Sequence, residues 1–218
     1  MYVELDVPEI SEHMSGFSQY WVCSLFIRPA SSSYQIRALT DTYVRLVGSA
    51  IIEYHSGRSK LKEYYSDTPS ASLKIGIMLQ AMSHFETCIS NMYRATNCFW
   101  RLRRRQDPLS TYINQERERA KFATDAIADR FGAIRNKVHH LEEMVMDGHI
   151  ADGQPFALGP SGPETPHPSE DDQTTKRIDG LTIGSNEVKF SELATWLKEM
   201  AYFVDKIANF LPNSNEEL

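Results

Sequence analysis

An arginine, an asparagine and two histidines stand within six residues of the chain, at Arg135, Asn136, His139 and His140. An imidazole titrates near neutral pH and can therefore accept or donate a proton during a reaction. A guanidinium group can stabilise negative charge that develops on a phosphoryl group, and an asparagine amide can orient either partner. These residue types favour acid–base cleavage of a phosphate ester. The alternative is a solvated helix face, with Arg135 in a weak surface ion pair and the histidines complementing a helix C-terminus.

The helix that carries these residues is predicted to span 122–146 and to stop at Asp147 and Gly148. At about 100° per residue, its apolar side chains fall within about 40° of one line. This stripe consists of Ile127, Phe131, Ile134, Val138, Leu141 and Val145. The four polar residues point away from the stripe, and therefore away from the core of their own domain.

Two small residues, Ala128 and Gly132, are predicted to share the polar face of this helix and to make it shallow. A glycine inside a helix costs about 1 kcal/mol relative to alanine, which a close approach of another backbone would explain. A merely tolerated glycine is the alternative. A two-fold homodimer joined through this face would bring two sets of histidines together, so that one group accepts a proton and another donates it.

A second cluster of basic residues ends an earlier predicted helix, whose apolar stripe runs from Ile75 to Phe99. Guanidinium groups match phosphate oxygens in a bidentate way, so this run is a candidate substrate-binding patch. The alternative is that these cations compensate the C-terminus of their helix. The run consists of Arg101, Arg103, Arg104 and Arg105.

The pattern along the chain predicts an all-α fold, an antiparallel bundle of four to five helices with a small β-hairpin insertion before the last helix. Residues 1–30 are predicted to form an N-terminal extension packed on the bundle, in which the β-prone QYWVCSLFIRP is extended. Residues 31–211 form the helical domain. Within it, the Pro- and Gly-rich acidic segment 147–176 is predicted to be a surface loop, 177–189 the hairpin, and 212–218 follow as a tail.

The composition excludes several functional classes. The formal net charge is −6 and the pI about 5.7, which argues against a protein that coats nucleic acid through bulk electrostatics but permits local phosphate contacts. The three cysteines show no CxxC spacing, and neighbouring His139 and His140 point about 100° apart, so neither a metal nor a cofactor is expected. No apolar run approaches the ~20 residues that cross a bilayer, and no secretory signal is visible, which predicts a cytoplasmic protein without membrane contact.

The run Arg135-Asn136-Lys137-Val138-His139-His140 resembles the Arg-Asn-x-x-x-His motif of HEPN proteins (higher eukaryotes and prokaryotes nucleotide-binding). The resemblance is specific over these six residues and extends to helical architecture across 31–211. It implies an all-α bundle, a dimer with a composite site, and metal-independent endoribonuclease activity of the kind found in defence and toxin–antitoxin systems. It also implies that Arg135 binds phosphate, that Asn136 is the polar position beside it, and that His140 is the acid–base residue. His139 lies closer to Arg135 on the helical wheel, so either histidine can fill that position.

Two functions follow as hypotheses. The first is a homodimeric endoribonuclease, which cleaves RNA by attack of the ribose 2′-hydroxyl on the adjacent phosphate and leaves a 2′,3′-cyclic phosphate. An antitoxin or regulatory protein that covers the same face is a possible further partner. The second is a non-catalytic HEPN-like module that binds another protein or a nucleotide, which the acidic net charge favours.

Overall fold

The computed structural model describes residues 1–10, 15–27, 31–66, 71–149, 151 and 153–210. The predicted tail at 212–218 lies outside them. The chain divides into two compact units. Unit 1 contains the described residues of Met1–Glu9, Ile52–Ser90 and Arg130–Thr195, and unit 2 those of Ile10–Ile51, Asn91–Asp129 and Trp196–Leu218.

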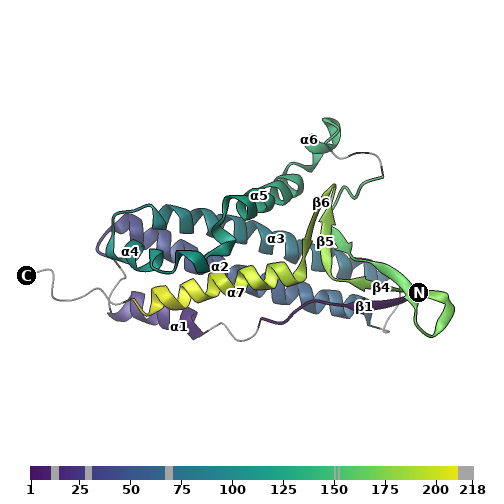
Figure 1. Ribbon diagram of the computed structural model, residues 1–218, viewed down its shortest axis with the longest axis horizontal. Coiled ribbons are helices and arrows are strands. Elements are labelled where there is room, and N and C mark those ends of the chain that lie inside the picture. The colour runs from purple at the N-terminus through teal and green to yellow at the C-terminus, as the bar shows by residue number, and fades with distance from the viewer. Residues whose placement is uncertain (11–14, 28–30, 67–70, 150, 152, 211–218) are drawn as a thin grey trace, which may run out of the picture. The chain divides into compact units, whose positions relative to one another are not determined.

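Most of the described chain is helical, as the apolar periodicity predicts (Figure 1). Four long helices contribute residues to both units. These helices are α2 (Tyr34–Tyr65), α3 (Ala71–Arg103), α5 (Asp125–His139) and α7 (Phe190–Ala208).

The prediction of an all-α bundle with one small β-hairpin is correct for the mostly helical chain but underestimates the β-structure, because unit 1 contains two three-stranded sheets. In the first, β4 (Glu170–Ile178) lies between β1 (Tyr2–Leu5), which is parallel to it, and β3 (Glu164–His167), which is antiparallel. In the second, β5 (Gly180–Ile183) lies between β2 (Gly159–Ser161) and β6 (Asn186–Lys189), antiparallel to both.

Much of segment 147–176, predicted to be a surface loop, is therefore strand. Its composition is polar and rich in Pro, which is typical of loops. However, β4 obtains its order from backbone pairing on both sides, and this pairing does not require apolar side chains. The β5–β6 hairpin lies where the sequence predicts one, with Gly184 in its turn at φ +56°.

Unit 1 is held together by aromatic side chains of α2, α3 and α7. Phe85 on α3 is fully buried, and its ring centroid lies 6.0 Å from that of Tyr54 and 5.1 Å from that of Phe190. The apolar stripe predicted for α3 is wrong at its start, where Ile75 is 67% exposed. Burial on this helix begins at Ala81 and Met82, because the preceding turns extend past the packed core.

Unit 2 has its own aromatic core, formed by Phe99, Phe122 and Phe203. The ring centroid of Phe99 lies 5.0 Å from that of Phe122 and 4.8 Å from that of Phe203. The predicted extended segment near Tyr20 is instead helical, as α1 (Ser15–Val22) followed by a π-helical turn. Its apolar, β-prone composition favours a strand, but Phe17 and Tyr20, three residues apart, are both buried, which is a helical spacing.

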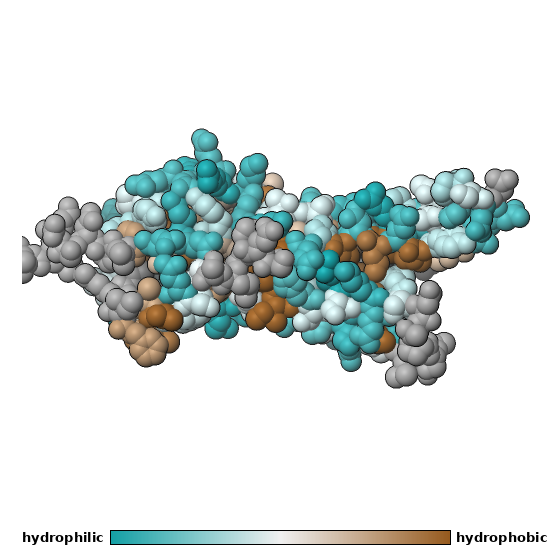
Figure 2. Space-filling model, turned by 90° about the horizontal axis from the view of Figure 1, so that it is seen from below, coloured by the Kyte–Doolittle hydropathy of each residue, from teal (hydrophilic) through white to brown (hydrophobic). Residues whose placement is uncertain are grey.

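Some large apolar side chains remain exposed on the described surface. On the face drawn in Figure 2, apolar residues (brown) form separate patches between hydrophilic residues (teal). The most exposed are Met146, Phe26, Tyr34 and Leu25. No helix of the described residues is long and apolar enough to cross a membrane.

Candidate functional site

The predicted helix 122–146 is interrupted just where the motif ends. After a 3₁₀ turn, α5 runs from Asp125 to His139, and His140 adopts φ −122° and ψ 36° before α6 (Leu141–Met146) begins. Phe131 and Ile134 are buried as the predicted stripe requires, but Val145 is 47% exposed. Beyond His139 the chain leaves the core, so burial no longer holds one straight helix together.

The motif face differs from the prediction in one respect. Ala128 is buried, with 5% of its surface exposed, and therefore belongs to the packed side of α5 and not to the polar side. Asn136, His139 and His140 are exposed, and Arg135 is half-buried. Arg135 donates from Nη1 to the side-chain Oδ1 of Asn136 at 3.1 Å, which fixes the amide beside the guanidinium.

His139 has a partner that sequence reasoning missed. Its Nε2 lies 3.0 Å from the Oγ of Ser90, a half-buried residue on α3 and 49 positions earlier in the chain. The two residues belong to unit 1. Nothing in the residues around Ser90 marks it, because only the packing of two helices brings it to the motif.

The charges around His139 favour its neutral form. Burial lowers the pKa of His139 below its usual value, and the positive charges of Arg135 and His140 lower it further. At neutral pH a histidine of this kind is mostly unprotonated, which is the form that can accept a proton.

His140 has different surroundings. Its Nδ1 lies 3.3 Å from a carboxylate oxygen of Glu143, one turn later on α6, and 46% of its side chain is exposed. The structure therefore separates two neighbouring histidines. His139 is within hydrogen-bond distance of Ser90 and is influenced by the charge of Arg135, whereas His140 contacts Glu143.

The β5–β6 hairpin contacts the motif at Lys137. Lys137 Nζ donates to the Oγ of Ser185 at 3.2 Å. The neighbouring Gly184 lies close to the same amino group, since a Cβ atom there would be 2.6 Å from Lys137 Nζ. The hairpin thus covers the Lys137 position of the motif.

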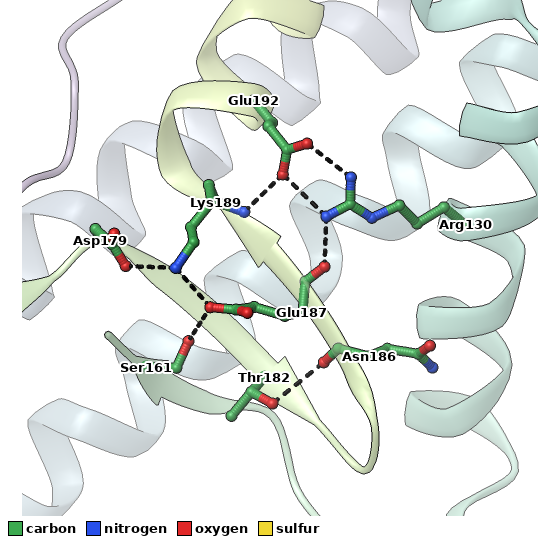
Figure 3. A network of polar contacts seen from close by, with 8 residues as sticks. All are labelled: Arg130, Ser161, Asp179, Thr182, Asn186, Glu187, Lys189 and Glu192. Atoms are coloured by element: carbon green, nitrogen blue, oxygen red, sulfur yellow. Dashed lines mark hydrogen bonds and ion pairs between the residues drawn. The ribbon is translucent and has the colours of Figure 1, made fainter. Parts of the chain in front are cut away.

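A network of polar contacts fastens the base of this hairpin to α5 (Figure 3). Arg130 on α5 binds both carboxylate oxygens of Glu192 at 2.7 and 2.9 Å and also donates to the backbone oxygen of Glu187 at 2.6 Å. Burial alone would raise the pKa of Glu192, but hydrogen bonds from Arg130 and from the backbone of Lys189 bring it below the usual value. The bidentate geometry orients α5 against β6 and the start of α7.

Lys189 extends the network to the neighbouring strand. Its Nζ donates to Asp179 at 2.9 Å and to Glu187 at 2.6 Å, and its backbone N–H donates to Glu192 at 3.0 Å. These contacts raise the pKa of Lys189, so it remains a cation. The motif helix is therefore positioned by ion pairs as well as by its apolar stripe.

The arginine run lies in unit 2, where its members have different surroundings. Arg101, Arg104 and Arg105 are exposed, and Arg103 is half-buried. Arg103 donates from Nε to Asn114 Oδ1 at 2.9 Å, and Asn114 Nδ2 donates back to the Arg103 carbonyl at the same distance. A role of this run in binding the substrate stays a prediction.

Among the described residues, no group of three or more His, Cys, Asp or Glu side chains is arranged to hold a metal ion. No family model, curated protein or solved structure matches the chain.

Proposed function

We propose that the chain is a metal-independent endoribonuclease that acts through Arg135, Asn136, His139 and His140. The observation that carries the proposal is the contact between His139 and Ser90, which holds an imidazole with a lowered pKa beside the guanidinium of Arg135. A neutral imidazole next to a cation is the arrangement that a phosphodiester transesterification requires. The similarity of the motif to that of HEPN proteins supports the same activity.

In the proposed reaction, Nε2 or Nδ1 of His139 accepts the proton of a ribose 2′-hydroxyl. The 2′-oxygen then forms a bond to the adjacent phosphorus as the bond from phosphorus to the 5′-oxygen breaks. His140 donates a proton to that leaving oxygen, and the products are a 2′,3′-cyclic phosphate and a 5′-hydroxyl. Arg135 stabilises the additional negative charge on the phosphoryl oxygens, and Asn136 orients its guanidinium.

A homodimer joined through the exposed face of α5 completes this proposal. Asn136, His139 and His140 lie on that face, so a second copy would place two histidine pairs around one RNA strand. The same proposal includes a HEPN-like bundle of four to five antiparallel helices and a cytoplasmic location. It also includes an antitoxin or regulatory protein that covers this face.

The test is cleavage of a single-stranded RNA by the purified full chain in EDTA. We expect Arg135→Ala and His139→Asn each to reduce kcat/KM by roughly 10² or more. The first variant loses the stabilisation of charge on the phosphoryl group, and the second loses the group that accepts the proton. A substrate with 2′-deoxyribose throughout should not be cleaved, because it lacks the attacking hydroxyl. His149→Asn is the matched control, since His149 is an exposed histidine of the same segment.

Two results would contradict the proposal. Equal cleavage by wild type, Arg135→Ala and His139→Asn would show that the motif does not carry the activity. A loss in His140→Asn together with full activity in His139→Asn would assign both proton transfers to His140 and remove His139 from the mechanism.

A non-catalytic module that binds a protein partner is the second candidate. The net charge of −6 favours it, because an acidic surface repels an RNA backbone over a distance of about 8–10 Å at physiological salt. In that case all variants would show no cleavage, and the exposed α5 face would carry the partner.

A further inference from the structure

A cavity of about 720 Å³ lies within unit 2, apart from the histidine motif in sequence. It is formed by the end of α3, by α4 (Pro108–Asn114), by the 3₁₀ turns that follow, and by the first residue of α5. This volume falls in the range of pockets that enclose small ligands. Its lining consists of Trp100, Arg103, Arg104, Asn114, Arg117, Ala120, Ala123, Thr124 and Asp125.

The lining carries an excess of positive charge, with three guanidinium groups and one carboxylate. Arg103 is held in place through its reciprocal hydrogen bonds with Asn114. Burial lowers the pKa of Arg103, and the nearby charge of Arg117 lowers it further, although it remains fully protonated at neutral pH. Arg103 and Arg117 therefore repel each other across the pocket.

No carboxylate of the described chain neutralises this charge through an ion pair. Arg103, Arg104 and Arg117 each lie more than 4.0 Å from every described Asp and Glu oxygen, including those of Asp125, which lines the same cavity. Two other cations of unit 2 differ, because Arg119 and Lys206 both pair with Glu116, at 3.5 and 2.5 Å. The three pocket arginines therefore have charge to offer a ligand.

Trp100 supplies a rigid planar surface beside these charges. It is half-buried, and its indole N–H donates to the carbonyl of Ala123 at 2.7 Å, which fixes the ring. A fixed indole can stack on a planar ring of a ligand, and Thr124 and Asp125 can hydrogen-bond its polar substituents. The combination of guanidinium groups and an aromatic face suits a phosphate ester better than a bare inorganic anion.

We propose that this pocket binds a small phosphate ester with a planar ring, whose phosphate contacts Arg103, Arg104 and Arg117 and whose ring stacks on Trp100. The site goes beyond the proposed ribonuclease function and does not depend on it. The arginine run is thereby divided. Arg103 and Arg104 belong to the pocket, Arg101 and Arg105 do not line it, and Arg117 joins from the turn after α4.

The test is binding of AMP to the full chain, measured by calorimetry and by quenching of tryptophan fluorescence, with inorganic phosphate, ribose 5-phosphate and adenosine as comparison probes. Arg104→Gln and Arg117→Gln are the informative variants, since both side chains are exposed and their loss leaves the core intact. We expect each to weaken AMP binding roughly tenfold or more, as for a lost charge-assisted hydrogen bond. Arg101→Gln changes an exposed arginine of α3 that does not line the pocket, and this variant should bind AMP like the wild type.

Further comparisons separate the two parts of the site. Trp100→Phe should bind ribose 5-phosphate as the wild type does but lose part of the preference for AMP. Arg135→Ala should retain AMP binding, so that failure of the ribonuclease proposal leaves this result unaffected.

Three results would overturn the proposal. These are no AMP binding at millimolar concentration, an equal loss in Arg101→Gln and Arg117→Gln, and binding of a single-stranded RNA oligonucleotide without binding of AMP. The last result would assign the arginines to an RNA strand instead of a small ligand.

Discussion

Ser90 Oγ and His139 Nε2 lie 3.0 Å apart, which joins α3 to the last residue of α5. The contact gives His139 a defined ring orientation on an otherwise exposed face. It also distinguishes His139 from His140, whose ring is held by Glu143 on the following helix.

Replacement of Ser90 by alanine should reduce kcat of RNA cleavage about two- to tenfold with little change in KM, because a hydrogen bond that orients a base contributes about 0.5–1.5 kcal/mol. Steady-state kinetics on a labelled RNA measures both constants. Ser83→Ala, an exposed serine two turns earlier on α3, is the control and should act like wild type. Ser90→Thr keeps the hydroxyl and should restore most of kcat, and no rescue would count against the orienting role.

The pKa of His139 should be measurable by NMR titration of its imidazole, and we expect a value below 6.5. Burial, Arg135 and His140 each disfavour the imidazolium, so Arg135→Gln should raise this pKa by removing one positive charge. Since neutral His139 accepts the proton, wild-type activity should rise with pH through this lowered value. A His139 pKa that does not increase in Arg135→Gln would show that the two side chains are not coupled in solution.

Arg130→Gln should lower the free energy of unfolding by about 1–3 kcal/mol, because it leaves a half-buried Glu192 without its bidentate partner. Urea denaturation followed by circular dichroism measures the change. Arg105→Gln, at an exposed arginine, is the control and should stay within about 0.5 kcal/mol of wild type. Similar stabilities for the two variants would mean that the network in Figure 3 contributes little.

Two helical glycines of unit 1 should respond to alanine in opposite directions. A Cβ at Gly57 on α2 would lie 3.0 Å from ring atoms of the buried Phe85, whereas a Cβ at Gly76 on α3 would meet nothing within 4 Å. Gly57→Ala should therefore destabilise the chain by about 1–2 kcal/mol through overpacking. Gly76→Ala should stabilise it by about 0.5–1 kcal/mol through helix propensity. Thermal unfolding of both variants provides the check, and changes of the same sign would contradict the packing around Phe85.

The sequence predicts those features of the fold and the site that depend on contacts between residues close together in the chain. Burial of Phe131 and Ile134 follows from helical periodicity, and the turn at Gly184 follows from local backbone preferences. Val145 was misplaced, because periodicity continues past the residue at which α5 ends and its core contacts cease.

The sequence does not predict features that depend on contacts between segments far apart in the chain. The strand β4 has a polar sequence and becomes ordered through β1 and β3, and β1 precedes it by about 170 residues. Ser90 reaches His139 in the same way, through tertiary packing. Arg117 was missed because a single exposed arginine shows in the sequence neither a cavity nor the other guanidinium groups beside it.

The parallel pairing of Tyr2 with Thr175 has a consequence for how the protein is made. At a synthesis rate of about 5–20 residues per second, roughly ten to thirty seconds pass between the synthesis of β1 and that of its partner strand β4. Unit 1 needs residues up to Thr195, and unit 2 needs the segment that starts at Trp196. Neither unit can therefore be completed before α7, which contributes residues to both, has been synthesised.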